Sequence, residues 1–203
     1  MRKINFTGIK PSASGSLDPG GYVCEITSAT DVPEKEYVKV LIEIAEGDRK
    51  GYFGSSGAWD SSHSLYFSYK DAALSMLLGR LDAITASNPG FDARAAFEGG
   101  HEELLVGRLV GVEFREEEYY NKNDDEFEIG RPRPDRLVPA DDVRQGRVKA
   151  QKPKMLKDDQ KVRALQRAGF SDAADHLREM QLGGDLPSGP MALDPDDAYD
   201  LPF

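Results

Sequence analysis

Five acidic residues in one short stretch are the side chains best suited to holding a metal ion. They are Glu116, Glu117, Glu118, Asp124 and Asp125. Carboxylate oxygens suit Mg²⁺, the ion that many nucleases use. Consecutive residues of a strand point to opposite faces, however, so the three glutamates cannot share one ion. A metal-dependent nuclease or recombination enzyme using Glu113, Glu116 and Glu118 is therefore kept as an alternative interpretation.

Other catalytic chemistries lack the residues they need. The sequence has one cysteine, Cys24, and three scattered histidines, which argues against a disulfide and a zinc site. Residues 47–51 lack the Lys-Ser/Thr ending of a phosphate-binding loop. The serines near His63 lack the nucleophile elbow of a hydrolase. We therefore expect a non-catalytic protein that needs no cofactor and no metal ion.

The last ten residues combine an acidic run with an aromatic residue at the terminal carboxylate. Phe203 can enter an apolar pocket of a partner while its carboxylate meets an Arg or Lys, and the aspartates can follow a basic rim. The stretch from Leu182 onward is rich in Gly, Pro and Asp, a composition typical of disorder, so the tip could reach partners freely. The expected partner-binding residues are Asp196, Asp197, Asp200, Leu201, Pro202 and Phe203.

Alternating side chains predict the strands that must position a site. The clearest strand is 36–45, where Val38, Val40, Ile42 and Ile44 point one way. A first strand covers 22–29. A third begins at Tyr52-Phe53 and resumes at 65–67 after a Gly/Ser-rich loop.

A helix and two further strands complete the pattern. Leu74, Leu77, Leu81 and Ile84 repeat at helical spacing, and residues 87–90 end that helix at Pro89. A fourth strand covers 105–119, with Glu113, Arg115 and Glu117 facing outward, and a weaker fifth covers 126–138. This order predicts a mainly β chain: a five-stranded OB-fold barrel with a helix between strands three and four. A generic antiparallel α+β domain is the alternative.

The C-terminal tip resembles that of bacterial single-stranded DNA-binding proteins, from which it departs by the insertion of Ala198-Tyr199. The body is similar to phage and prophage proteins of the same type at 21–22, 44–47, 87–91, 106–111 and 115–119. The resemblance implies an OB-fold that coats single-stranded DNA during phage replication or recombination. It also implies that the tip recruits replication and recombination proteins.

Binding of single strands requires aromatic faces for the bases and cations for the phosphates. An OB-fold offers these on the outer face of strands two and three and in nearby loops. Of the adjacent rings Tyr52 and Phe53, one is expected in the core, and Trp59 either plugs the barrel end or awaits a ligand. The expected DNA-binding residues are Tyr37, Lys39, Arg49, Lys50, Tyr52, Phe53, Trp59, Tyr66, Arg115, Tyr119, Tyr120, Lys122, Arg131 and Arg133.

Charge divides the chain into three parts. Residues 1–130 carry a net charge of −10, residues 131–167 carry +7 and residues 168–203 carry −7. The basic segment could follow phosphates, or bind the tail or a partner subunit. We expect an OB-fold DNA-binding domain at 1–150, a basic helical extension at 151–182 and a disordered acidic tail at 183–203.

The remaining expectations concern location and assembly. The N-terminus lacks the apolar region of a secretory signal, and no apolar run approaches the roughly 18 residues of a membrane span. We expect a cytoplasmic protein of a bacterial host cell with no membrane partner. A homo-oligomer is expected, with a dimer as the assumed state. A protein–protein adaptor with an OB-like barrel is a further alternative.

Removal of the acidic tip should tighten DNA binding at low salt, because the free aspartates compete with phosphates for the same cations. The measurement is the affinity for oligo-dT of the full chain and of a chain ending at Leu193. Unchanged or weaker affinity of the shorter chain would contradict this competition.

Overall fold

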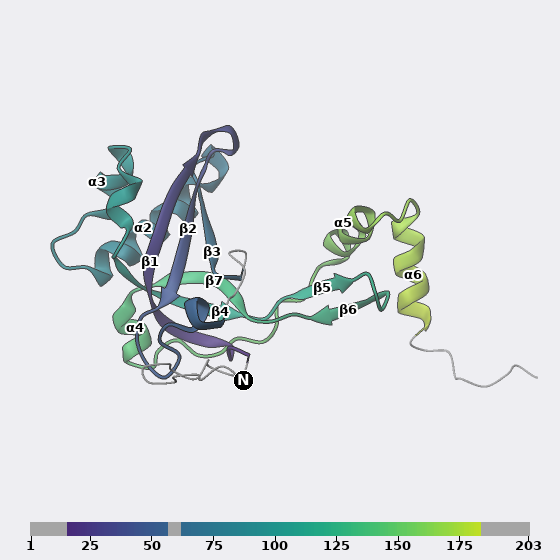
Figure 1. Cartoon of the computed structure of the whole chain (residues 1–203). Coiled ribbons are helices and arrows are strands. Elements are labelled where there is room, and N and C mark those ends of the chain that lie inside the picture. The colour runs from purple at the N-terminus through teal and green to yellow at the C-terminus, as the bar shows by residue number, and fades with distance from the viewer. Residues whose placement is uncertain (1–15, 57–61, 184–203) are drawn as a thin grey trace, which may run out of the picture. The chain divides into compact units, whose positions relative to one another are not determined.

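The computed structural model describes residues 16–56 and 62–183 of the 203-residue chain (Figure 1). The chain divides into two compact units. The first consists of the described part of Met1–Tyr119 together with Glu128–Met155, and the second of Tyr120–Phe127 and the described part of Leu156–Phe203. Trp59, the acidic tail from residue 184 and the C-terminal tip lie outside the described residues.

The first unit is built on one antiparallel sheet of five strands. These are β1 (Gly20–Val32), β2 (Tyr37–Ile44), β3 (Ser64–Ser68), β4 (Leu109–Arg115) and β7 (Arg133–Val138). Their order is β3-β2-β1-β4-β7, and the sheet curls into a nearly closed, OB-like barrel (Figure 1). The predicted five-stranded barrel is thereby confirmed.

Helix α2 (Leu74–Ser87) lies between β3 and β4 in the chain, as the sequence predicted. Shorter helices follow and precede it. These are α1 (Tyr52–Ser56), α3 (Ala93–Glu98), α4 (Ala140–Arg144) and the 3₁₀ segments Pro33–Lys35, Asp71–Ala73 and Glu102–Leu105. Among the described residues, no helix has the length and apolar character needed to span a membrane.

Alternation along the strands fills the barrel interior. Val38, Val40, Ile42 and Ile44 of β2 are all buried, as predicted, and they meet the buried rings of Phe67 and Phe114 from other strands. The lone Cys24 is fully buried among them, and burial raises the pKa of its thiol well above its ordinary value. The inward-facing residues of β2 therefore belong to the core, and its alternate residues face outward, where they can contact other molecules.

Two predicted strands differ from the observed ones near their ends. Tyr52 and Phe53 do not begin a strand; they open helix α1, because the Glu43 carboxylate accepts hydrogen bonds from the amides of Phe53 (2.9 Å) and Gly54 (2.6 Å). Glu113 was predicted to face outward, but its side chain is only 3% exposed. It accepts from the Arg136 Nε at 3.0 Å.

The predicted fourth and fifth strands are each divided in two. Beyond β4 and ahead of β7, the chain forms a separate hairpin of β5 (Glu118–Asn121) and β6 (Glu126–Ile129). Pro132 lies between β6 and β7, and Pro134 is the second residue of β7. Proline has no backbone N–H, so neither residue can donate a hydrogen bond to a neighbouring strand. The barrel thus receives only Leu109–Arg115 and Arg133–Val138 from this region.

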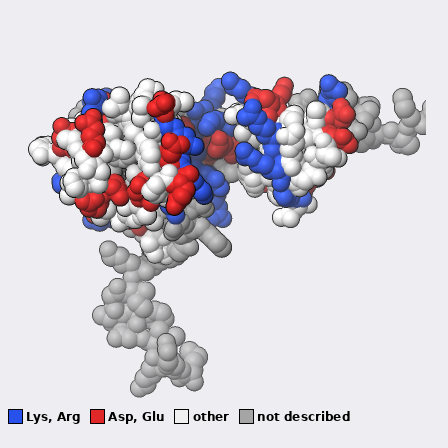
Figure 2. Space-filling model, turned by 90° about the horizontal axis from the view of Figure 1, so that it is seen from above, with Lys and Arg blue, Asp and Glu red and all other residues white. Residues whose placement is uncertain are grey.

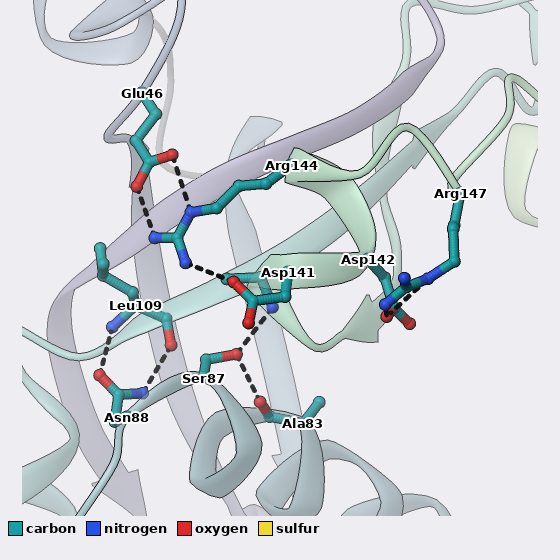
Figure 3. A network of polar contacts seen from close by, with 10 residues as sticks. Glu46, Ala83, Ser87, Asn88, Leu109, Asp141, Asp142, Arg144 and Arg147 are labelled. Atoms are coloured by element: carbon teal, nitrogen blue, oxygen red, sulfur yellow. Dashed lines mark hydrogen bonds and ion pairs between the residues drawn. The ribbon is translucent and has the colours of Figure 1, made fainter.

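Polar side chains join α2, α4 and the strands (Figure 3). The Asn88 amide donates to the carbonyls of Ile84 (2.7 Å) and Leu109 (2.8 Å) and accepts from the Leu109 amide (3.0 Å). Arg144 binds Glu46 through two nitrogens, at 2.6 and 3.1 Å, and Asp141 through a third at 2.8 Å. These bonds fix the end of α2 to β4, and the end of α4 to the loop after β2.

The second unit has a small core of its own. Helices α5 (Asp158–Ala168) and α6 (Ala173–Gly183) provide Leu165 and Leu177 to it, and the rings of Tyr120 and Phe127 come from the hairpin. The Tyr120 hydroxyl donates to Asp125. Desolvation and this bond raise the pKa of Tyr120 to about 12. The C-terminal helical segment expected from the sequence is confirmed as these two helices.

Gly111→Ala should destabilise the protein, because a methyl group there would lie 2.8 Å from both Val138 and Val143 and 2.9 Å from the Pro139 carbonyl oxygen. We expect a loss of about 1–3 kcal/mol in the free energy of unfolding, measured by urea denaturation. Gly79→Ala is the matched control. Gly79 is exposed within α2 and its added methyl would meet no atom within 4 Å, so a gain of about 0.5–1 kcal/mol is expected. Equal effects of both changes would contradict the packing seen at Gly111.

Candidate nucleic-acid interface

The outward face of β2 and β3 brings three of the predicted binding residues together. Lys39 lies directly opposite Tyr66 in the ladder, and Tyr37 lies opposite Ser68. Because directly paired residues share a face of the sheet, Tyr37, Lys39 and Tyr66 all point away from the barrel interior. Their inward neighbours Val38 and Phe67 are buried. Of the adjacent rings Tyr66 and Phe67, Tyr66 is therefore the exposed one, at 48%.

The rings of Tyr37 and Tyr66 form an edge-to-face pair. Their centroids are 5.1 Å apart and their planes make an angle of 84°, a favourable aromatic geometry. Perpendicular rings cannot both stack on consecutive parallel bases. The pair therefore offers one stacking surface, the exposed ring of Tyr66, supported from the side by Tyr37.

Arg80 of α2 lies at the seam between the two edge strands of the barrel. Its guanidinium donates to the Tyr66 carbonyl at 2.5 Å and lies 5.5 Å from the centre of the Phe67 ring. Burial lowers the pKa of Arg80, and the negative charge of Asp135 on β7 opposes that shift. Arg80 thus supplies β3 with a donor on the side where no ladder to β7 is formed among the described strands.

The structure contains a cleft of about 420 Å³ near the start of β3, since one of its lining residues, Ser62, precedes β3 by two residues. It brings together three predicted binding residues, Tyr119, Arg131 and Arg133, with Ser62 and four other residues. The Tyr119 ring is 44% exposed, and its hydroxyl donates to Glu128 at 2.9 Å, which fixes the ring. The lining residues that the sequence did not suggest for nucleic-acid binding are Ser62, Glu117, Glu118, Gly130 and Pro132.

Two acidic residues in the described part of the chain line this cleft, and each is either paired with a cation or buried. The Glu117 carboxylate is 3.2 Å from the Lys154 ammonium, and Glu118 is buried. Among the described residues, the charged lining residues that are exposed and form no ion pair are Arg131 and Arg133. In the view of Figure 2, both acidic and basic side chains appear on the surface of the first unit.

The other predicted binding residues of the barrel have structural contacts. Phe53 is 5% exposed and stacks on Phe114 and His63; it was expected to contact DNA, and this expectation is corrected, because the ring belongs to the core. Tyr52 packs against the same core. Arg49 lies 3.7 Å from Asp18, and Lys50 is exposed in the same loop.

The remaining three predicted binding residues belong to neither cluster of side chains: they do not line the cleft, and they do not lie on β2 or β3. Arg115 donates to the Lys152 carbonyl at 2.7 Å and lies 3.9 Å from Asp135. Tyr120 packs within the second unit against Phe127 and Phe170, and Lys122 is exposed at the hairpin turn of that unit.

The carboxylates of the alternative nuclease do not converge. Glu113 is paired with Arg136, Glu118 is buried, and Glu116 is partly buried on the connection between them. Within residues 16–56 and 62–183, no three His, Cys, Asp or Glu side chains are grouped so that they could hold a metal ion.

Sequence comparisons add no relative from which a function could be taken. No protein-family model matches this chain, and no curated protein matches it either.

Arg80→Leu should loosen the seam, because the Tyr66 carbonyl would lose a charged donor. We expect a loss of about 1.5–3 kcal/mol in unfolding free energy, with faster amide hydrogen exchange in β3 than in β1. Arg108→Leu is the control, since Arg108 also covers a ring, that of Phe91, and donates to the Leu104 carbonyl away from this seam. Unchanged exchange in β3 of Arg80→Leu would show that the bond does not hold this edge.

Proposed function

We propose that this protein is a non-catalytic single-stranded DNA-binding protein. The observation that carries the proposal is the outward face of β2 and β3, where the half-exposed Tyr66 ring stands beside Tyr37 and opposite Lys39. A ring held in this way offers a flat surface to an unpaired base, and stacking of this kind does not depend on base identity.

The cleft at the end of β3 supports the same proposal. It combines an exposed ring, Tyr119, with Arg131 and Arg133, the pairing of stacking surface and cations that unpaired strands need. Tyr66 and this cleft are close in the chain, since Ser62, which lines the cleft, precedes β3 by two residues and Tyr66 by four. A bound strand could therefore contact both.

The proposal extends to the cellular role. As a protein of phage type, it coats single-stranded DNA during replication or recombination in a bacterial host cell. It acts as a homo-oligomer. Residues 194–203, with their acidic run and terminal phenylalanine, recruit replication and recombination proteins. The OB-like barrel supports this reading because such barrels commonly bind oligonucleotides on this face.

Tyr66→Ala should weaken binding of a fluorescent oligo-dT, because one stacked base contributes about 1–3 kcal/mol. That energy corresponds to a rise in Kd of about 5-fold to 150-fold, measured by fluorescence anisotropy. Tyr66→Phe keeps the ring and should bind within a few-fold of the unaltered protein. Leu74→Ala, which shortens an exposed side chain on α2, should have no effect.

The same titration distinguishes the alternative functions. A protein–protein adaptor would bind no oligo-dT at any salt concentration. A nuclease would degrade the oligonucleotide in Mg²⁺. Either result would overturn the proposed function. Affinity that falls as salt rises, with the oligonucleotide intact, would support it.

A further inference from the structure

The basic segment 131–167 separates into two kinds of cation. Its arginines within the first unit that follow Arg133 are paired with carboxylates. Arg136 pairs with Glu113. Arg144 pairs with Glu46 and Asp141, and Arg147 with Asp142 (Figure 3). Bidentate and multiple bonds of this kind position secondary structure. These arginines hold β7 and α4 in place, so their charges are already neutralised.

Two lysines of the same segment differ from these arginines. Lys149 and Lys152 are exposed, and neither forms an ion pair with any carboxylate in the part of the chain that the structure describes. They belong to an extended stretch, residues 149–154, which we call the strap. It lies between α4 and the end of the first unit.

Three hydrogen bonds fix the strap backbone at Lys152 and Lys154 to residues 115–118, at the end of β4 and the start of β5. The Arg115 Nε donates to the Lys152 carbonyl at 2.7 Å. The Lys154 amide donates to the Glu116 carbonyl and the Glu118 amide donates to the Lys154 carbonyl, both at 2.9 Å. Lysines on a fixed backbone lose less freedom when they contact a ligand than lysines on a mobile loop would.

These contacts also place the strap beside the cleft. Lys154 pairs with Glu117, which lines the cleft, and Arg115, which holds Lys152, lies opposite Arg133 in the β4–β7 ladder. Arg133 is itself a lining residue. Residues 152–154 of the strap therefore lie next to the cleft, and Lys149 precedes them by three residues in the chain.

We propose that Lys149 and Lys152 bind the phosphodiester backbone of a single strand where it leaves the cleft. This inference rests on the proposed function and adds a contact surface to it. A lysine acts as a mobile point charge that attracts a phosphate without reading the base. The strap should thus add affinity equally for all sequences, whereas Tyr66 and Tyr119 add stacking.

The test is the double variant Lys149→Gln/Lys152→Gln, titrated with oligo-dT over a range of salt concentrations. Each phosphate contact to a single strand contributes about 0.7 to the slope of log affinity against log salt. Loss of two contacts should therefore reduce that slope by about 1.4, with a weaker Kd at low salt and convergence at high salt. The thermal unfolding midpoint should not change.

Lys70→Gln is the matched control, an exposed lysine two residues beyond the opposite end of β3. It should leave the slope unaltered. If the unaltered protein binds oligo-dT and the strap variant keeps the full slope, the strap inference is overturned while the proposed function stands. A loss of about 0.7 in the slope of Lys70→Gln, half the loss of the double variant for half the charge removed, would overturn it as well, because the effect would then be one of net charge. Absence of binding by the unaltered protein would instead refute the proposed function.

Discussion

The barrel depends on one constraint: each strand must place one row of side chains in a shared apolar interior. On β2 this row is Val38, Val40, Ile42 and Ile44, all buried. Its period of two leaves the alternate row, including Tyr37 and Lys39, on the outside. The ladder with β3 then adds Tyr66 to the same surface. The candidate interface is thus the complement of the core, since a slip of one residue would exchange the two rows.

Local patterns were sufficient where local forces decide the structure. The alternation of β2, the helix period of α2 and its end near Pro89 are all set by neighbouring residues, and each was predicted. Distant partners decided the rest. Phe53 was misassigned because Glu43, ten residues earlier, caps α1. Glu113 was misassigned because Arg136 neutralises it from the next strand of the barrel.

The candidate site also combines residues that could be predicted from local patterns with residues whose placement depends on distant partners. Tyr37 and Lys39 could be assigned to the outer face from alternation alone, but the choice between Tyr66 and Phe67 required the β2–β3 register. Arg80 and the strap carry no sequence signal of their own, because their roles depend on the Tyr66 carbonyl and on Arg115. Ion pairs also redistribute the charge of this acidic protein: Lys154 neutralises Glu117 in the cleft, and Arg144 and Arg147 are neutralised by carboxylates elsewhere.

The chain passes between its two units three times, after Tyr119, after Phe127 and after Met155. The hairpin rings Tyr120 and Phe127 are covered by residues that come only after the last of these passages, among them Phe170 and Leu165. A protein shortened at Met155 would therefore keep a barrel but display an uncovered aromatic surface on its hairpin. The second unit therefore cannot be removed by one truncation, because its hairpin residues 120–127 are inserted between two parts of the first unit and would lose their apolar cover.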